Sequence, residues 1–381
     1  MSDRIRVAML IQRYYPHIGG AERQLAALAP LLNKQGVDIH IITRRDRGLA
    51  QFEYIDCVPV HRLPIPGPKP LASLMYTLTA LHLLHQSRPD IIHAHELLSP
   101  ATTAVVAKRW LGTPIVAKVL RGGALGDLAK LRHKPLGANR IASLRRHMDA
   151  FIAISREIAA ELEAFGIDPA RRIYIPNGVD TNHFSPATPA EKQALRQSLG
   201  FPPDRPLALF MGRLAAEKRV DNLLAVWPVI RQMHPYAELF IIGTGEEEST
   251  LRAAAGPGVT FKGAIANVLP YLQIADVFVL PSATEGLSNV MLEALATGLP
   301  VIATRVGGAP DIIDDGINGC LIPPDDHRHL QEALSTLLSD ASLRATFGSR
   351  RAFIKQHYAL PVTAQRLRAL YDQLLRLQAS T

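Results

Sequence analysis

Two glutamates, Glu285 and Glu293, stand eight positions apart in the stretch SATEGLSNVMLEALATGLP, residues 282–300. The apolar run at 277–281 predicts a strand and residues 288–297 predict a helix, so Glu285 lies in the loop before this helix and Glu293 lies within it. Because eight residues span more than two turns at about 3.6 residues per turn, the two carboxylates cannot form a close pair. We expect them to contact different parts of one extended ligand.

The backbone between the two glutamates favours phosphate. The first turn of a helix has free N–H groups and a positive dipole end, and both bind anions. The predicted order is therefore carboxylate, phosphate cradle, carboxylate, which matches the sugar hydroxyls, diphosphate and ribose hydroxyls of a nucleotide-sugar. The alternative is that one glutamate complements the helix dipole and the other is solvated, and the spacing alone does not exclude it.

Two cations follow another predicted strand, at 207–211. The run GRLAAEK, residues 212–218, places Arg213 at the end of this strand and Lys218 at the start of the next helix. Both are predicted to face one anion, which Arg can bind bidentately and Lys as a point charge. The alternative is a solvated basic loop.

The first half of the chain offers two further loops after predicted strands. Gly19-Gly20 follows the strand at 6–11 and precedes a helix, an arrangement that lets a phosphate approach the backbone. The loop lacks the G-x-G-x-x-G of dinucleotide sites. His93-Ala94-His95 ends the strand at 90–93, where open α/β sheets bind ligands, and alternation sends both imidazoles to one side. His93 is equally well interpreted as a packed structural residue, and a metal site would lack a third ligand.

The run EGLSNVMLE resembles the E-x7-E signature of retaining glycosyltransferases with the GT-B fold, in particular glycosyltransferase family 4. The Gly-Gly loop, the His-x-His, the Asn177-Gly178-Val179-Asp180 run and the G-R-x-x-x-E-K run also resemble motifs of this family, and they occur in the family's order. The resemblance covers nearly the whole chain.

This resemblance implies transfer of a sugar, with retained configuration, from a UDP- or GDP-linked donor to an acceptor hydroxyl in cell-surface glycan or glycolipid synthesis. Glu285 would hold sugar hydroxyls, Glu293 the ribose, and His95 would lie near the transferred sugar. No cofactor and no metal are implied, and the absence of Asp-x-Asp from the sequence argues against a metal-held diphosphate. The implied catalytic residues are His95, Arg213, Lys218 and Glu285. The implied donor-binding residues are Gly19, Gly20, Arg213, Lys218, Lys262, Glu285, Gly286, Leu287, Ser288 and Glu293.

Two other classes stay open. One is a nucleotide-sugar epimerase with the GT-B fold, which would release product without an acceptor. The other is a non-catalytic sugar-binding module, which the joint presence of the site residues argues against.

Alternating strands and helices in each half predict an α/β protein with two Rossmann-like, doubly wound parallel-sheet domains. The resemblance adds that these are the halves of a GT-B fold facing a cleft. We expect an acceptor-side domain at 1–180, a proline-rich linker at 181–204, a nucleotide-sugar domain at 205–357 and a helix returning to the first domain at 358–381.

Charge divides the chain of 381 residues unevenly. Residues 1–180 hold 24 Lys and Arg against 15 Asp and Glu, a net +9, whereas the remainder has 18 against 19, a net −1. No nucleic-acid recognition motif accompanies this basic half. The stretch 118–147 interleaves basic and apolar residues and predicts an amphipathic surface for an anionic membrane, where a lipid-linked or oligosaccharide acceptor would be presented. The alternative is that it packs inside the domain. Its apolar members are Leu125, Leu128, Leu131, Leu136, Ile141 and Leu144.

Localisation follows from composition. Only two cysteines occur, Cys57 and Cys320, and they form neither a disulfide framework nor a metal spacing. The apolar run at the N-terminus is too short for a signal peptide and no run reaches the length of a membrane span. We therefore expect a cytoplasmic protein, peripheral at the inner face of the cell membrane if the basic surface binds lipid.

Overall fold

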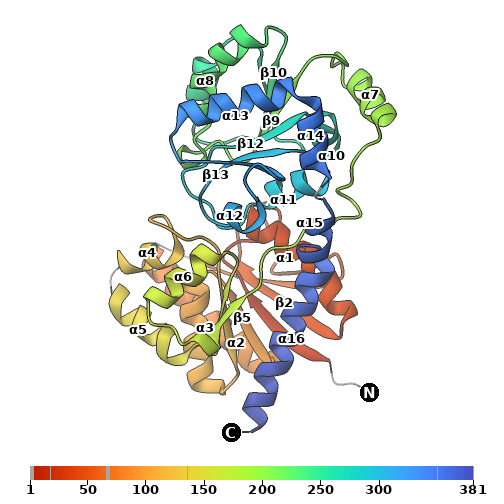
Figure 1. Ribbon diagram of the computed structural model, residues 1–381. Coiled ribbons are helices and arrows are strands. Elements are labelled where there is room, and N and C mark those ends of the chain that lie inside the picture. Colours follow the sequence, from red (N-terminus) through yellow and green to blue (C-terminus); the bar gives the residue numbers. More distant parts are fainter. Residues whose placement is uncertain (1–3, 18, 66–68, 135, 350, 381) are drawn as a thin grey trace. The chain divides into compact units, whose positions relative to one another are not determined.

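The structure is a computed structural model that describes residues 4–17, 19–65, 69–134, 136–349 and 351–380. The chain forms two compact units, residues 1–177 with 360–381 and residues 178–359 (Figure 1). Each unit is built around one sheet flanked by helices, as the alternation of apolar strands and helices predicts. Residues 181–204, predicted as a linker, belong to the second unit.

The first unit contains an eight-stranded sheet in the order β3-β4-β2-β1-β5-β6-β7-β8. Its inner strands are short apolar runs, as expected for parallel strands covered on both faces. The strands are β1 (Ile5–Leu10), β2 (Val37–Arg44), β3 (Phe52–Ile55), β4 (Val58–Leu63), β5 (Ile91–His95), β6 (Ile115–Val119), β7 (Ala150–Ala153) and β8 (Arg172–Tyr174).

Strand β3 corrects the prediction of a wholly parallel sheet, because it pairs antiparallel with β4. The two strands are joined by Asp56 and Cys57, whose φ angles of 48° and 62° are both positive, as in the tight turns of hairpins. Phe52 and Tyr54 are exposed on this edge strand, so it lacks the buried apolar run by which the other strands were predicted.

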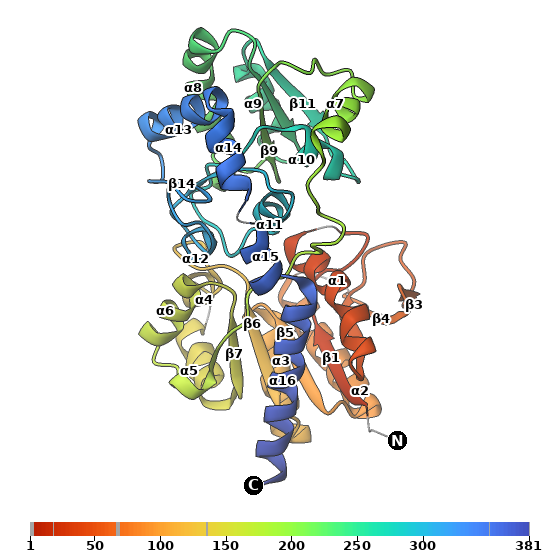
Figure 2. The same ribbon diagram turned by 45° about the vertical axis from the view of Figure 1, so that its right-hand side comes forward.

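Seven α-helices formed by the described residues of the first unit surround this sheet. α1 continues through Pro30 to Lys34, although a proline within a helix removes one backbone hydrogen bond. α16, the last helix of the chain, lies against α1 (Figure 2), and its Tyr371 hydroxyl is 2.7 Å from Nδ1 of His93 on β5. The helices are α1 (Gly20–Lys34), α2 (Lys69–Ser87), α3 (Ser99–Leu111), α4 (Asp127–Arg132), α5 (Gly137–His147), α6 (Arg156–Ala164) and α16 (Leu360–Ala379).

The basic stretch 118–147 folds differently from the amphipathic surface that its sequence predicts. Leu128, Leu131 and Leu144 are buried in the core, and Lys118 is buried within β6. Leu125 lies before α4, so the three-residue spacing of leucines does not continue along one helix. The leucines within α4 and α5 are therefore turned inward, whereas Leu125 and Leu136, which precede the two helices, are exposed together with the charged side chains.

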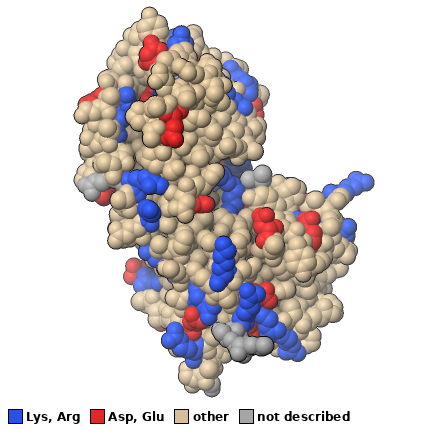
Figure 3. All heavy atoms as spheres, turned by 90° about the vertical axis from the view of Figure 1, so that its right-hand side faces the viewer, with Lys and Arg blue, Asp and Glu red and all other residues tan. Residues whose placement is uncertain are grey.

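Surface charge is mixed where it can be seen directly. On the face drawn in Figure 3, Lys and Arg side chains are interspersed with Asp and Glu. Among the described residues, no helix combines the length and the apolar character that crossing a membrane requires.

The second unit contains a six-stranded parallel sheet in the order β11-β10-β9-β12-β13-β14. The strands are β9 (Leu207–Met211), β10 (Glu238–Ile242), β11 (Val259–Gly263), β12 (Val277–Leu280), β13 (Val301–Thr304) and β14 (Gly319–Ile322). The α-helices are α7 (Pro189–Ser198), α8 (Val220–Met233), α9 (Glu248–Ala254), α10 (Leu269–Ile274), α11 (Asn289–Ala296), α12 (Ala309–Ile312), α13 (His327–Ser339), α14 (Ala341–Gly348) and α15 (Arg351–His357).

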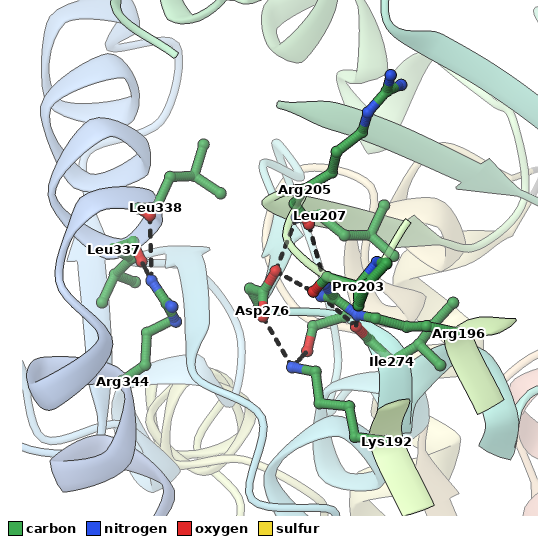
Figure 4. Close-up of polar contacts among 11 residues, drawn as sticks. Lys192, Arg196, Pro203, Arg205, Leu207, Ile274, Asp276, Leu337, Leu338 and Arg344 are labelled. Carbon is green, nitrogen blue, oxygen red and sulfur yellow. Dashed lines mark hydrogen bonds and ion pairs between the residues drawn. The ribbon is translucent and has the colours of Figure 1, made fainter. Parts of the chain in front are cut away.

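Helix α7 is fastened to the sheet by Asp276, at the start of β12 (Figure 4). Lys192 and Arg196 of α7 donate to the two carboxylate oxygens of Asp276, each at 2.7 Å. Burial alone would raise the pKa of Asp276, but the two cations outweigh it and lower the pKa. A buried carboxylate paired in this way keeps its charge, so the proline-rich segment is a fixed part of the unit.

Candidate active site

The strand order of the second unit creates a switch point at the carboxyl ends of β9 and β12, the place in an open α/β sheet where a ligand-binding crevice is expected. These strands are neighbours, but the chain passes from β9 to β10 on one side and from β12 to β13 on the other. Open α/β sheets bind ligands at such a switch point. Arg213 and Lys218 follow β9 and Glu285 follows β12, so the fold brings three predicted site residues to this one place.

Lys218 and Glu285 form a direct ion pair across the switch point. Lys218 Nζ lies 2.5 Å from Oε1 of Glu285, and the two side chains are only 14% and 10% exposed. Lys218 ends a 3₁₀ turn, η2 (Ala216–Lys218), instead of starting the α-helix as predicted. The residue predicted to bind phosphate therefore lies directly beside the residue predicted to bind the sugar.

Arg213 is more open and is held by other partners. Its guanidinium lies 2.5 Å from Oε1 of Glu217 and 3.7 Å from Oε1 of Glu246, and its side chain is 56% exposed. The two predicted cations thus contact different carboxylates. Because the Arg213 and Glu246 side chains are both more than half exposed, their contact can be exchanged for a phosphate at small energetic cost, whereas the closer partner, Glu217, is only 13% exposed.

The loops at this edge of the sheet are joined through their backbones. Ala283 N donates to the Glu217 carbonyl at 2.8 Å, and Gly308 N donates to the Gly286 carbonyl at 2.6 Å. Gly307 has φ +58°, and a side chain there would begin 2.6 Å from the carbonyl oxygens of Glu285 and Gly286. Only glycine fits at this approach, so the β13 loop fixes the backbone of the Glu285 loop.

Helix α11 carries Glu293 as predicted. Ser288 caps it, accepting from Met291 N at 3.4 Å, and Gly286 and Leu287 lead into the cap. Glu293 is only 5% exposed and Glu285 8%, which excludes the alternative of a solvated surface glutamate for either residue. The two carboxylates occupy a loop and a helix, so they lie at different places beside the switch point.

Lys262 lies farther along the sheet, on the edge strand β11. Its ammonium stands 4.3 Å from the centre of the Phe240 ring, an attractive cation–π contact. The structure therefore places Lys262, which is predicted to bind the sugar donor, two strands from β9 and apart from the Lys218–Glu285 pair.

The first unit has a switch point of the same kind between β1 and β5. Gly20 begins α1 beyond β1, as the Gly-Gly motif predicts. The Glu22 carboxylate occupies the space that a side chain on Gly19 would need. Burial raises the pKa of Glu22, while backbone N–H groups of Glu22 and Gly19 oppose the rise. The helix N-terminus is thus covered by its own carboxylate.

His95 ends β5 at this second switch point. Its ring is stacked on His93 with centroids 4.5 Å apart and planes 11° from parallel, so both imidazoles do lie on one side. Burial lowers the pKa of His95 well below its usual value, with His93 and Lys118 adding to the effect. His95 is therefore a neutral imidazole at physiological pH, suited to hydrogen bonding.

Two neighbours of His95 were not predicted from the sequence. Burial lowers the pKa of Lys118 to about 8, and its ammonium donates to Oδ1 of Asn177 at 2.9 Å. Burial, assisted by Asp127 and Glu22, raises the pKa of Glu96 to about 8. Glu96 also has φ +82°, an uncommon conformation for a residue with a side chain. Charge near His95 thus changes close to pH 8 while His95 itself stays neutral.

Comparison with known proteins decides the family. Residues 18–183 match the model of Glycosyltransferase Family 4, and residues 205–340 match that of Glycosyl transferases group 1. A GDP-mannose-dependent alpha-mannosyltransferase of Mycobacterium tuberculosis is 30% identical over 97% of this chain and 96% of that protein. The chain belongs to glycosyltransferase family 4.

Two further similarities place this glycosyltransferase among its relatives. A GDP-mannose-dependent monoacylated alpha-(1-6)-phosphatidylinositol monomannoside mannosyltransferase of Corynebacterium glutamicum is 36% identical, over 54% of this chain and 56% of that protein. HepE of Anabaena, solved with UDP-glucose, has a TM-score of 0.80 at 21% identity, covering 99% of this chain and 100% of HepE. At this identity the likeness shows the fold, which is GT-B.

Sequence reasoning missed the residues that hold the predicted site of the glycosyltransferase. Ser282 donates to Oε1 of Glu285 at 2.7 Å, and Glu217 contacts Arg213. The signal for Ser282 is local, since a serine three residues before a loop glutamate can reach its carboxylate. The signal for Glu217 is the i, i+4 spacing from Arg213.

Proposed function

We propose that this glycosyltransferase transfers a sugar, with retained configuration, from a nucleoside-diphosphate-sugar to an acceptor hydroxyl. The Lys218–Glu285 pair is the main support for this proposal, because a cation suited to phosphate there contacts a carboxylate suited to sugar hydroxyls at a switch point of the sheet. The donor is UDP- or GDP-linked by analogy with two similar proteins, the GDP-mannose-dependent mannosyltransferase of Mycobacterium tuberculosis and HepE, which was solved with UDP-glucose.

In this proposal each side chain has one role. Lys218 and Arg213 leave their present carboxylate partners and neutralise the diphosphate, which is the leaving group and gains charge in the transition state. Glu285 accepts sugar hydroxyls and Glu293 accepts the ribose hydroxyls. The amides of Gly286, Leu287 and Ser288 face the diphosphate, Lys262 and the Gly19-Gly20 turn complete the donor contacts, and neutral His95 hydrogen-bonds the transferred sugar.

A binding and turnover screen tests the proposal. Purified protein is heated with UDP, GDP and ADP, since a ligand that binds the folded state raises the melting temperature by mass action. The matching nucleotide-sugars are then offered with candidate acceptors, and the anomeric configuration of the product is read by NMR. No stabilisation by any nucleoside diphosphate would refute the proposal, and inversion would refute retention.

Activity is expected to survive an excess of EDTA. The reason is that Arg213 and Lys218 supply the positive charge that a divalent ion supplies in enzymes with an Asp-x-Asp motif, which this sequence lacks. Initial rates are compared with EDTA, with EDTA plus excess Mg²⁺, and with neither. Loss of activity on chelation that Mg²⁺ or Mn²⁺ restores would contradict metal independence.

The acceptor is proposed to be lipid-linked or an oligosaccharide presented at an anionic membrane surface. Lys130, Arg132 and Lys134 are exposed in the first unit, whose sequence carries the basic excess. Leu128, Leu131 and Leu144 of this segment are buried, but Leu125 and Leu136 are 46% and 73% exposed, so the segment offers charge together with some apolar surface. Further exposed apolar side chains lie on α2, where Leu71, Leu74 and Leu78 are each about half exposed and follow one helical stripe.

Co-sedimentation with anionic liposomes separates the two contributions. Changing Lys130, Arg132 and Lys134 to Glu is expected to abolish the salt-sensitive part of binding, at about 1 kcal/mol per residue. Leu74→Glu with Leu78→Glu should weaken the part that persists at high salt. Donor binding serves as the control and should be unchanged in both variants. No sedimentation of the wild-type protein at low salt would favour a soluble acceptor.

A further inference from the structure

Glu285 receives two hydrogen bonds on the same oxygen. Lys218 Nζ lies 2.5 Å from Oε1 and Ser282 Oγ lies 2.7 Å from Oε1. Neither contact is made to Oε2. A carboxylate held by two donors on one oxygen has its plane fixed, and its second oxygen is directed away from both donors.

Ser282 is built into the protein as a fixed donor. Its exposed fraction is 0%, so its hydroxyl cannot reach a ligand in the crevice. Its carbonyl accepts from Oγ1 of Thr304 at 2.5 Å, and the next residue, Ala283, donates to the Glu217 carbonyl at 2.8 Å. The serine is thus held from β13 on one side and from the η2 turn on the other.

The two donors to Oε1 differ in what a ligand does to them. In the proposed function, Lys218 moves toward the diphosphate when the donor binds, and its bond to Glu285 is weakened. The bond from Ser282 has no such competitor, because its hydroxyl is shielded from the crevice. Ser282 therefore keeps the carboxylate oriented when it has to contact the sugar.

We propose that Ser282 is a positioning residue that orients Glu285 so that Oε2 accepts a hydroxyl of the transferred sugar. The inference rests on the proposed function, because it assumes that Glu285 contacts the sugar. It assigns the serine a role in transfer and none in binding the nucleoside diphosphate.

Ser282→Ala is expected to lower kcat by about 10- to 100-fold, the effect of losing a hydrogen bond to a charged group. The Kd of the free nucleoside diphosphate should change by no more than about twofold from the wild-type value. The Kd of the nucleotide-sugar should rise until it approaches the Kd of the free nucleoside diphosphate. GDP with GDP-mannose, and UDP with UDP-glucose, are the probe pairs. A merely structural serine would act differently, because a loosened loop would also release Glu217 and weaken nucleoside diphosphate binding.

Ser155→Ala is the matched control. Ser155 is also 0% exposed, and its hydroxyl caps α6 in the first unit by accepting from Ile158 N at 3.2 Å. Its removal should lower the melting temperature and leave the difference in affinity between nucleotide-sugar and nucleoside diphosphate unchanged.

A double-mutant cycle decides whether Ser282 acts through Glu285. In a Glu285→Ala background, adding Ser282→Ala should not change the ratio of the two dissociation constants further, because no carboxylate is left to orient. An equal loss in both backgrounds, or normal kinetics of Ser282→Ala, would overturn the inference while the proposed function stands. If the wild-type protein binds no nucleotide-sugar, both the proposed function and the role of Ser282 are refuted.

Discussion

Arg213→Ala is expected to lower kcat/KM by about 10²- to 10³-fold, as when an electrostatic stabiliser of the transition state is removed. The free energy of unfolding should change much less than the activity, because the Arg213 side chain is 56% exposed and its pair with Glu246 is a surface interaction worth about 0–1 kcal/mol, although its closer partner, Glu217, is only 13% exposed. A large kinetic loss without a loss of stability separates a role in leaving-group stabilisation from a role in folding.

Arg328→Ala provides the matched control for Arg213. Arg328 also pairs with a glutamate four residues on, Glu332 at 3.0 Å, and its side chain is 69% exposed, but it lies on α13. Both variants are compared in steady-state kinetics and thermal unfolding. Arg328→Ala should resemble the wild-type protein in both measurements. If folded Arg213→Ala also has near-normal kcat/KM, the leaving diphosphate is not stabilised by Arg213.

The sequence was sufficient for the features that depend on local patterns. Apolar runs predicted the inner strands, and the alternation of strands and helices predicted two doubly wound sheets. Strand β3 was missed because its aromatic residues are exposed and its pairing depends on a turn with two positive φ angles. Leu128, Leu131 and Leu144 were predicted to lie on a membrane-binding surface but are buried. An amphipathic pattern does not reveal whether its apolar face packs against a core or against a membrane.

The candidate site was predictable in its residues but not in their partners. The motifs predicted Arg213, Lys218 and Glu285 as site residues, and the sheet order explains why all three lie at one switch point. The direct contact between Lys218 and Glu285 could not be predicted, because the residues are 67 positions apart and meet only through tertiary folding. The juxtaposition of His93 and His95 was predictable from strand alternation, but the burial that lowers the pKa of His95 was not.

Glu285→Gln and Glu293→Gln are expected to have different effects, because the two carboxylates occupy different elements. Glu285 is in the loop beside Lys218, where the sugar is proposed to bind, and Glu293 is buried within α11. Glu285→Gln should lower kcat on the order of 10²-fold and leave the affinity for the free nucleoside diphosphate almost unchanged. Glu293→Gln should weaken that affinity by about 10- to 100-fold, the effect of losing charged hydrogen bonds to the ribose.

Calorimetric titration with the free nucleoside diphosphate, alongside kinetics with the nucleotide-sugar, measures both effects. Each variant is the control for the other, since both remove one negative charge from a carboxylate that is less than a tenth exposed. Glutamine keeps the size of the side chain, so its effect reports on charge and hydrogen bonding instead of on a cavity. Equal effects of the two changes on nucleoside diphosphate affinity would contradict the order of carboxylate, phosphate cradle and carboxylate. The eight-residue spacing of Glu285 and Glu293 would then say nothing about which part of the donor each carboxylate contacts.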